Sequence, residues 1–168
     1  MKFINKISIL SVVAVLILSS CSKKPDVEYT APYKFAGEWW VTLTVNGQDV
    51  YHIGHTMLST YNTSANSNEI WVDDLKHGYG FKVKATTDPA NMSFTATNTA
   101  NQYFNSATPA AFPKTVILNN GKVLAGAGKT RSGNAADSIY MEAEFVDDPG
   151  TKYVITGHQR TGFFEDEY

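Results

Sequence analysis

Few residues in the chain are spaced for hydrolytic chemistry. Ser138 follows Asp137 and could act as a nucleophile if one of the four histidines folded beside it, since such a hydroxyl needs an adjacent base. Serine–aspartate pairs are abundant at strand edges, however, and the Gly-x-Ser-x-Gly turn that presents the nucleophile in many esterases does not occur. The sequence therefore assigns no catalytic residue and favours a binding protein over an enzyme.

Metal-ligating residue types are present, but their spacing does not favour a metal site. His52 and His55 lie three positions apart, and on a strand such residues point to opposite faces. The acidic stretches 73–74, 147–148 and 165–167 could offer oxygen ligands to calcium, but none has the glycine spacing of a known calcium loop. We interpret them as solvated turns and a charged tail, and expect no metal and no cofactor.

The residue whose surroundings predict a modification most clearly is Cys21, the single cysteine of the chain. Basic residues and a short apolar run at 7–18 precede it, which is typical of a secretory signal and too short to span a bilayer. The run ends in Leu18-Ser19-Ser20-Cys21, which resembles the bacterial lipobox. We expect residues 1–20 to be a lipoprotein signal peptide and Cys21 to be lipidated with palmitate or similar chains. The alternative is an ordinary signal peptide with a chance cysteine.

This lipidation would attach the protein firmly to a membrane, because several acyl chains bind far more tightly than one. Ser22, directly after the cysteine, is compatible with an outer membrane, either on its periplasmic face or at the cell surface. Residues 21–34 are polar and contain proline, so we interpret them as a lipidated tether. The formal charge of −2 becomes more negative without Lys2 and Lys6, which argues against a nucleic-acid partner.

The strand that organises the remaining chain is 37–45. It places Trp39, Val41, Leu43 and Val45 on one face and polar residues on the other, the alternation of a half-buried strand. Asn46-Gly47 then predicts a tight hairpin turn. We expect strands over 37–45, 50–61, 69–74, 79–86, 92–97, 115–118, 122–127, 138–146 and 151–158. Together these predict one all-β domain over 35–168, an antiparallel barrel of about eight strands.

A barrel of this size is filled by side chains or holds one small ligand. Small residues at 125–127, 143 and 157 favour a partly open interior. The aromatic and other large side chains expected on inward faces are candidates for lining it. These candidate ligand-lining residues are Trp39, Tyr51, His55, Met57, Phe81, Phe94, Met141 and Phe145. His55 would otherwise be a hydrogen-bonded core histidine.

Closure of the barrel predicts a contact between its two ends. The first and last strands must be neighbours if no free edge remains. We therefore expect Trp39 to close one end, with the guanidinium of Arg160 lying across its indole, as arginine can stack on an aromatic face. The alternative is an Arg160 in solvent beside the acidic tail.

Five segments resemble a family of bacterial lipoproteins described as lipid-binding putative hydrolases. They are Gly37-Glu38-Trp39-Trp40-Val41, 61–66, 71–74, 147–150 and 161–167. The resemblance extends over essentially the whole chain after the signal peptide. It implies a lipocalin-like β-barrel on a membrane-anchored lipoprotein and a lipid or other apolar ligand. No catalytic residue of a hydrolase can be assigned from it.

Two functions remain open. In the first, the barrel binds a lipid or another apolar small molecule near the membrane. In the second, the interior is filled and the protein is an accessory surface lipoprotein that contacts a protein or glycan through an exposed Trp40 and the asparagine-rich loops 62–68 and 98–105. An esterase-type hydrolase is a weaker third possibility.

Overall fold

The computed structural model describes residues 28–65 and 67–168. The predicted signal peptide 1–20, Cys21 and the first part of the 21–34 tether lie outside these residues. Within the described part of the chain, no helix combines the length and the apolar character needed to cross a membrane.

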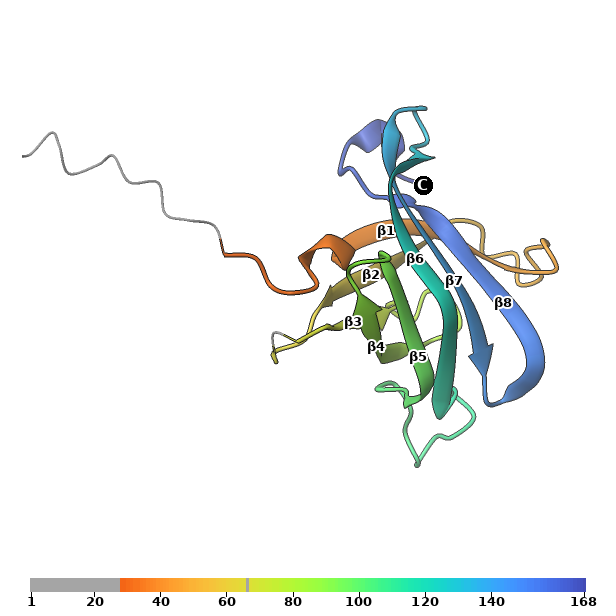
Figure 1. Cartoon of the computed structure of the whole chain (residues 1–168). Coiled ribbons are helices and arrows are strands. Elements are labelled where there is room, and N and C mark those ends of the chain that lie inside the picture. Colours follow the sequence, from red (N-terminus) through yellow and green to blue (C-terminus); the bar gives the residue numbers. More distant parts are fainter. Residues whose placement is uncertain (1–27, 66) are drawn as a thin grey trace, which may run out of the picture.

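The described residues form a closed antiparallel barrel of eight strands, in which each strand pairs with the next and β1 pairs with β8 (Figure 1). The strands are β1 (Gly37–Val45), β2 (Thr56–Asn62), β3 (Glu69–Asp73), β4 (Lys82–Asp88), β5 (Ser93–Ala100), β6 (Thr115–Lys129), β7 (Ala135–Phe145) and β8 (Asp148–Gln159). Two short 3-10 helices flank them, η2 (Tyr33–Phe35) and η3 (Phe164–Asp166). The all-β barrel predicted from the sequence is confirmed, including the pairing of its terminal strands.

Strand β1 follows its sequence pattern. Trp39, Val41 and Leu43 are buried in the barrel, and Gly37 makes room for the indole, because a Cβ there would lie 3.2 Å from a ring carbon of Trp39. The predicted turn forms at Asn46 and Gly47, which have φ of 51° and 78°. Positive φ at both central residues is the geometry that an Asn-Gly hairpin turn requires.

Strand β2 differs from its prediction. It begins only at Thr56, and Thr56, Leu58 and Thr60 are its buried residues. The preceding residues form a loop held by the Asp49 carboxylate, which accepts hydrogen bonds from the amides of Ile53 and Gly54. The expectation that His55 and Met57 face inward from a strand 50–61 was therefore wrong, since the inward face of β2 belongs to Thr56, Leu58 and Thr60.

Strand β6 also differs, because the two short strands predicted at 115–118 and 122–127 are one strand of 15 residues. Its register with β7 shifts between Asn119 and Lys122, where Asn120 has φ of 53°. Gly121 is required there, since a Cβ would lie 2.5 Å from the ring of Phe94. The asparagines and glycine that resembled a hairpin turn thus form a bulge.

The barrel interior is filled rather than partly open. One continuous cluster of buried side chains extends from Phe35 and Trp39 at one end to Phe145 and Tyr153 at the other. Residues 125–127, taken as signs of a cavity, lie exposed on the projecting part of β6. Gly157 has a different role, because a Cβ there would lie 1.9 Å from the Trp40 carbonyl oxygen of the neighbouring strand β1.

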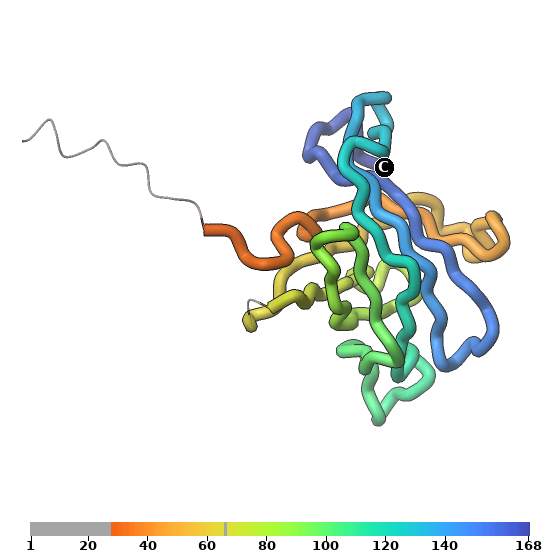
Figure 2. Tube along the Cα trace, in the orientation of Figure 1, coloured from red at the N-terminus to blue at the C-terminus, as the bar shows by residue number. Residues whose placement is uncertain are grey.

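The two ends of the barrel are built from different segments. We call the end formed by loops 46–55, 74–81, 101–114 and 146–147 the mouth. The opposite end, with segment 28–36, loop 130–134 and tail 160–168, is the closed end. Figure 2 shows the first described residues and the C-terminal tail leaving the barrel on the side away from loop 101–114.

Candidate functional site

The mouth contains a cavity of about 300 Å³. Its lining comes from all four mouth loops and combines aromatic, aliphatic and carboxylate side chains. The lining residues are Tyr51, Ile53, Gly78, Tyr79, Ala111, Pro113 and Asp147. Ligand cavities in proteins begin at about this volume and are typically apolar with a few polar groups. The mouth is therefore the candidate binding site.

Aromatic rings separate this cavity from the barrel core. Tyr79 lies parallel to Phe145, with ring centroids 3.7 Å apart and an interplanar angle of 8°. Tyr153 packs edge-on against both rings, at 5.2 Å from Tyr79 and 5.1 Å from Phe145. A ligand in the mouth would thus rest on an aromatic floor and would not enter the interior.

Hydrogen bonds orient the phenols of this floor. Tyr153 donates to Asp148, so the 2.8 Å contact between the Tyr51 and Tyr153 hydroxyls has Tyr51 as its donor. Tyr79 donates to Asp147 at 3.3 Å. Burial, and then the Asp147 charge, raise the pKa of Tyr79 to about 12. Burial and the bond to Asp148 raise the pKa of Tyr153. Both phenols remain protonated at neutral pH and suit binding rather than proton abstraction.

Two buried polar side chains hold the mouth loops. The Asp74 carboxylate accepts hydrogen bonds from the amides of Gly80 at 2.6 Å, Phe81 at 2.8 Å and Lys76 at 3.0 Å. Burial raises its pKa, although these amides oppose the shift. Asp74 therefore stabilises loop 74–81, which carries Gly78 and Tyr79.

Asn101 connects that loop to the next one. Its amide nitrogen donates to the carbonyls of Gly80 and Pro113, and its oxygen accepts from the amide of Lys82. The cavity walls are therefore fixed before a ligand binds. Sequence reasoning missed both roles: Asp74 was considered only as part of a calcium pair, and Asn101 only as part of a polar loop. Among the residues that the structure describes, no group of three or more acidic, histidine or cysteine side chains could hold a metal ion.

The predicted ligand-lining residues do not form one site. Tyr51 lines the mouth cavity. Trp39, Phe81, Phe94, Met141 and Phe145 are at most 1% exposed and pack the core instead. His55 and Met57 lie outside the barrel, because the inward face of β2 belongs to Thr56, Leu58 and Thr60.

Trp39 is buried at the closed end, and its contacts differ from the predicted one. The Trp39 indole nitrogen donates to Thr60 Oγ1 at 2.8 Å, and Thr60 Oγ1 donates to the Phe35 carbonyl of η2 at 2.5 Å. This chain of bonds leaves no polar group of the indole unpaired in a buried position, where that would be costly.

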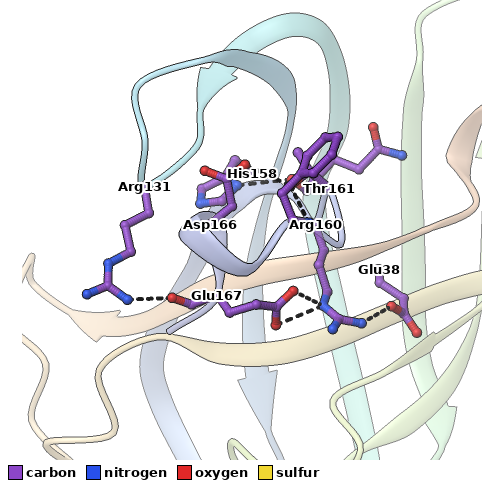
Figure 3. Close-up of polar contacts among 9 residues, drawn as sticks. Glu38, Arg131, His158, Arg160, Thr161, Asp166 and Glu167 are labelled. Atoms are coloured by element: carbon purple, nitrogen blue, oxygen red, sulfur yellow. Dashed lines mark hydrogen bonds and ion pairs between the residues drawn. The ribbon is translucent and has the colours of Figure 1, made fainter.

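The predicted stacking of Arg160 on Trp39 is wrong. The guanidinium bonds Glu38 and Glu167, each at 2.8 Å, as Figure 3 shows. Glu38 and Trp39 are successive residues of β1 and point to opposite faces. The charge of Arg160 therefore lies on the outside, where two carboxylates attract it. Its amide still donates to the Glu38 carbonyl and extends the pairing of the terminal strands.

The C-terminal tail folds back over the outer surface of the closed end. Asp166 accepts hydrogen bonds from the amide and hydroxyl of Ser132 and from the hydroxyl of Thr161, and the bond from the Ser132 hydroxyl in particular holds the pKa of Asp166 well below its usual range. Arg131 donates to the Glu167 carbonyl (Figure 3). The tail is thereby fixed to loop 130–134.

Tyr168, the last residue of the tail, covers Trp40, which the sequence predicted to be exposed. Tyr168 packs edge-on against Trp40 at 5.6 Å and lies parallel to the His55 ring at 3.8 Å. Trp40 is only 8% exposed, so the expectation of an exposed Trp40 is wrong. Burial, and then nearby His158, lower the pKa of His55.

No hydrolytic pair forms around Ser138. The register of β7 and β8 places it opposite His158, but the ring nitrogens of His158 contact the Gln159 carbonyl and the Tyr168 hydroxyl. The esterase hypothesis therefore gains no hydrogen-bonded nucleophile and base from this pair.

Comparison with protein-family models gives a match. A family model described as lipid-binding putative hydrolase matches residues 24–164, which is most of the chain. No curated protein matches the sequence. The match agrees with the resemblance carried by the five sequence segments.

Proposed function

The chain belongs to the family of lipid-binding putative hydrolases, and we propose that it is a membrane-anchored lipoprotein that binds a lipid or another apolar small molecule at the mouth of its barrel. The observation that carries this proposal is the preformed mouth cavity with an aromatic floor. Anchoring would come from a lipidated Cys21, in the outer membrane.

The lining of the mouth favours a neutral ligand. Ile53, Ala111 and Pro113 offer apolar surface, and the rings of Tyr51 and Tyr79 add aromatic surface. Asp147 is the one charged residue among the described residues that line the cavity. A carboxylate there repels an anionic head group, and a hydroxyl or amine of a ligand can donate to it. A monoacylglycerol fits this chemistry better than a free fatty acid.

The filled interior favours the second candidate, an accessory lipoprotein that contacts a protein or glycan. With the core packed from Trp39 to Phe145, the part of the chain that the structure describes contains no deep cavity of the lipocalin kind for a large lipid. A small mouth cavity would then be incidental to a surface interaction. The two functions differ in whether a lipid binds the isolated full chain.

The test uses Nile red, a neutral fluorescent probe, with the full chain. We expect monoolein to displace the probe more effectively than oleate at pH 7.5. Ile53→Asp should weaken probe binding by at least about tenfold, about 1.4 kcal/mol, because it places a carboxylate in the apolar wall. Val50→Asp, in the same loop but outside the lining, is the matched control. Equal binding by both variants, or no probe binding at all, would favour the accessory function.

A further inference from the structure

The most exposed large apolar side chains lie far from the mouth. Among the described residues, Phe164 is 93% exposed, Tyr29 is 65% and Phe163 is 63%. All three belong to the closed end: Tyr29 precedes η2 and stacks on Tyr33 with ring centroids 4.4 Å apart, and the two phenylalanines lie in the tail. Neighbouring exposed apolar side chains such as Phe163 and Phe164 commonly mark an interaction surface.

The phenylalanines are held out by a fixed turn. Phe164 begins η3, whose Asp166 is bonded to Ser132 and Thr161. In the next residue, Glu167, the carboxylate binds the guanidinium of Arg160 and the main-chain carbonyl accepts a hydrogen bond from Arg131. Figure 3 shows these bonds converging on the short segment that follows the phenylalanines. The structure therefore presents Phe163 and Phe164 to solvent through a bonded turn.

The geometry points to a lipid bilayer as the partner of the closed end: we propose that Phe163 and Phe164 insert into the membrane interface, so that the mouth faces away from the membrane. Adjacent aromatic residues at a protein surface suit this layer, which accepts apolar rings beneath the head groups.

The position of the anchor supports this orientation, and here the inference rests on the lipidation included in the proposed function. Seven residue steps separate Cys21 from Glu28, where the described chain begins at the closed end. Fully extended, they span about 25 Å at most. A lipidated Cys21 would hold the closed end within that reach of the bilayer, while the mouth lies at the other end of the barrel.

The charged residues around Phe163 and Phe164 indicate which lipids this part of the tail would contact. Glu165 is exposed beside Phe164, and the nearby Arg131 and Arg160 are both bonded to Glu167. These bonds engage the two arginines, which leaves the apolar rings as the contact that Phe163 and Phe164 offer. The contact should therefore depend on the apolar rings, occur on phosphatidylcholine and change little with salt.

The functional consequence is a separation of the binding site from the membrane that holds the protein. A ligand at the mouth would be exchanged with the aqueous phase or with a partner there. In this orientation the mouth does not reach the bilayer that anchors the protein, so a lipid could not be taken up directly from it.

The test uses the full lipidated chain in phosphatidylcholine vesicles with brominated acyl chains. Because Cys21 would be blocked by lipid, a bimane label can be placed at Glu165→Cys beside the intact phenylalanines, or at Val50→Cys in the mouth. We expect the label at 165 to be quenched at least about threefold more strongly, since an interfacial segment lies within about 5–10 Å of the acyl boundary.

Substitution of both rings then tests their role. Phe163→Ser with Phe164→Ser should reduce quenching at 165 to the level at 50, while Val50→Ser with Val146→Ser, an exposed apolar pair at the mouth, should leave it unchanged. Equal quenching at 165 and 50 in the parent chain, or no effect of the double serine variant, would overturn the inference. Nile red binding measured on the same variants reports separately on the mouth site.

Discussion

The two ends of this barrel solve different physical problems with the same eight strands. At the closed end, the Trp39 indole, Thr60 and the Phe35 carbonyl form a buried chain of hydrogen bonds, and the tail adds a layer outside it. At the mouth, Asp74 braces loop 74–81 and Asn101 joins it to loop 101–114, and a cavity remains above the aromatic floor. The comparison teaches that buried hydrogen bonds close the barrel interior at one end, whereas braced loops surround a cavity at the other.

The largest effect on stability is expected at the pairing of β1 with β8, which closes the barrel and supports both of its ends. Gly157→Ala would place a Cβ 1.9 Å from the Trp40 carbonyl oxygen, so β1 and β8 could not pair. We expect a loss of more than about 4 kcal/mol in the free energy of unfolding, which is exceptional for one substitution. Urea unfolding followed by circular dichroism measures it. Thr156→Ala, on the exposed face next to it, is the control, and similar stability of the two variants would contradict this close contact.

The next prediction compares the ends directly. Trp39→Ala removes the largest side chain of the closed end and should cost about 3–5 kcal/mol of unfolding free energy, the usual range for deleting a large buried aromatic side chain. Tyr51→Ala, at the half-exposed rim of the mouth, should cost about 1 kcal/mol or less. If the two substitutions destabilised the protein equally, the mouth would be part of the structural core.

A smaller effect is expected in the tail. Asp166→Asn keeps the shape of the side chain but weakens its bonds to Ser132 and Thr161. Amide hydrogen exchange should accelerate over 160–168 and around Trp40, because the tail opens locally more often. Exchange in mouth loop 74–81 should stay unchanged. Faster exchange in both regions would mean that the ends are coupled.

The smallest effect is a pH dependence that comes from His55, whose ring lies against Tyr168 of the tail. The pKa of His55 is lowered in the folded protein, so the unfolded chain takes up the proton first. Stability is therefore complete above the unfolded value of about 6.5 and decreases as the pH falls from there towards the folded pKa.

His55→Asn should remove that decrease in the melting temperature measured between pH 7.5 and pH 5. The mouth phenols Tyr79 and Tyr153 have raised pKa values and contribute nothing in this window. If the melting temperature of His55→Asn still decreased on acidification, and substitution of Tyr79 or Tyr153 removed the decrease, His55 would not be the group responsible for the pH dependence.

Alternation in the sequence predicted the parts of the fold that are regular strands. Along most of β1, β4 and β7 the inward residues are apolar, and Val41, Val83 and Met141 are buried as expected. It failed for β2, where apolar residues before Thr56 lie in a loop fixed by Asp49. A side chain bonded to backbone amides a few residues later leaves no periodic signal.

The candidate site was less predictable for a related reason. Tyr51 was identified, but the cavity depends on Asp74 and Asn101, whose partners are backbone groups of other loops. Arg160 illustrates the same difficulty, because its partners Glu38 and Glu167 are 122 and seven residues away in sequence. Pairing of terminal strands follows from closure, whereas the choice among nearby partners depends on which face each side chain occupies.

The central claim, that lipid binds at the mouth above a filled core, is tested most directly by photo-crosslinking. The full chain would be irradiated with a monoacylglycerol carrying a diazirine in its acyl chain, and the adducts mapped by peptide mass spectrometry. We predict adducts in 46–55, 74–81, 101–114 and 146–147, the four loops that line the cavity. Adducts on interior residues such as Leu58 or Met141, or on tail residues 160–168 alone, would contradict the account.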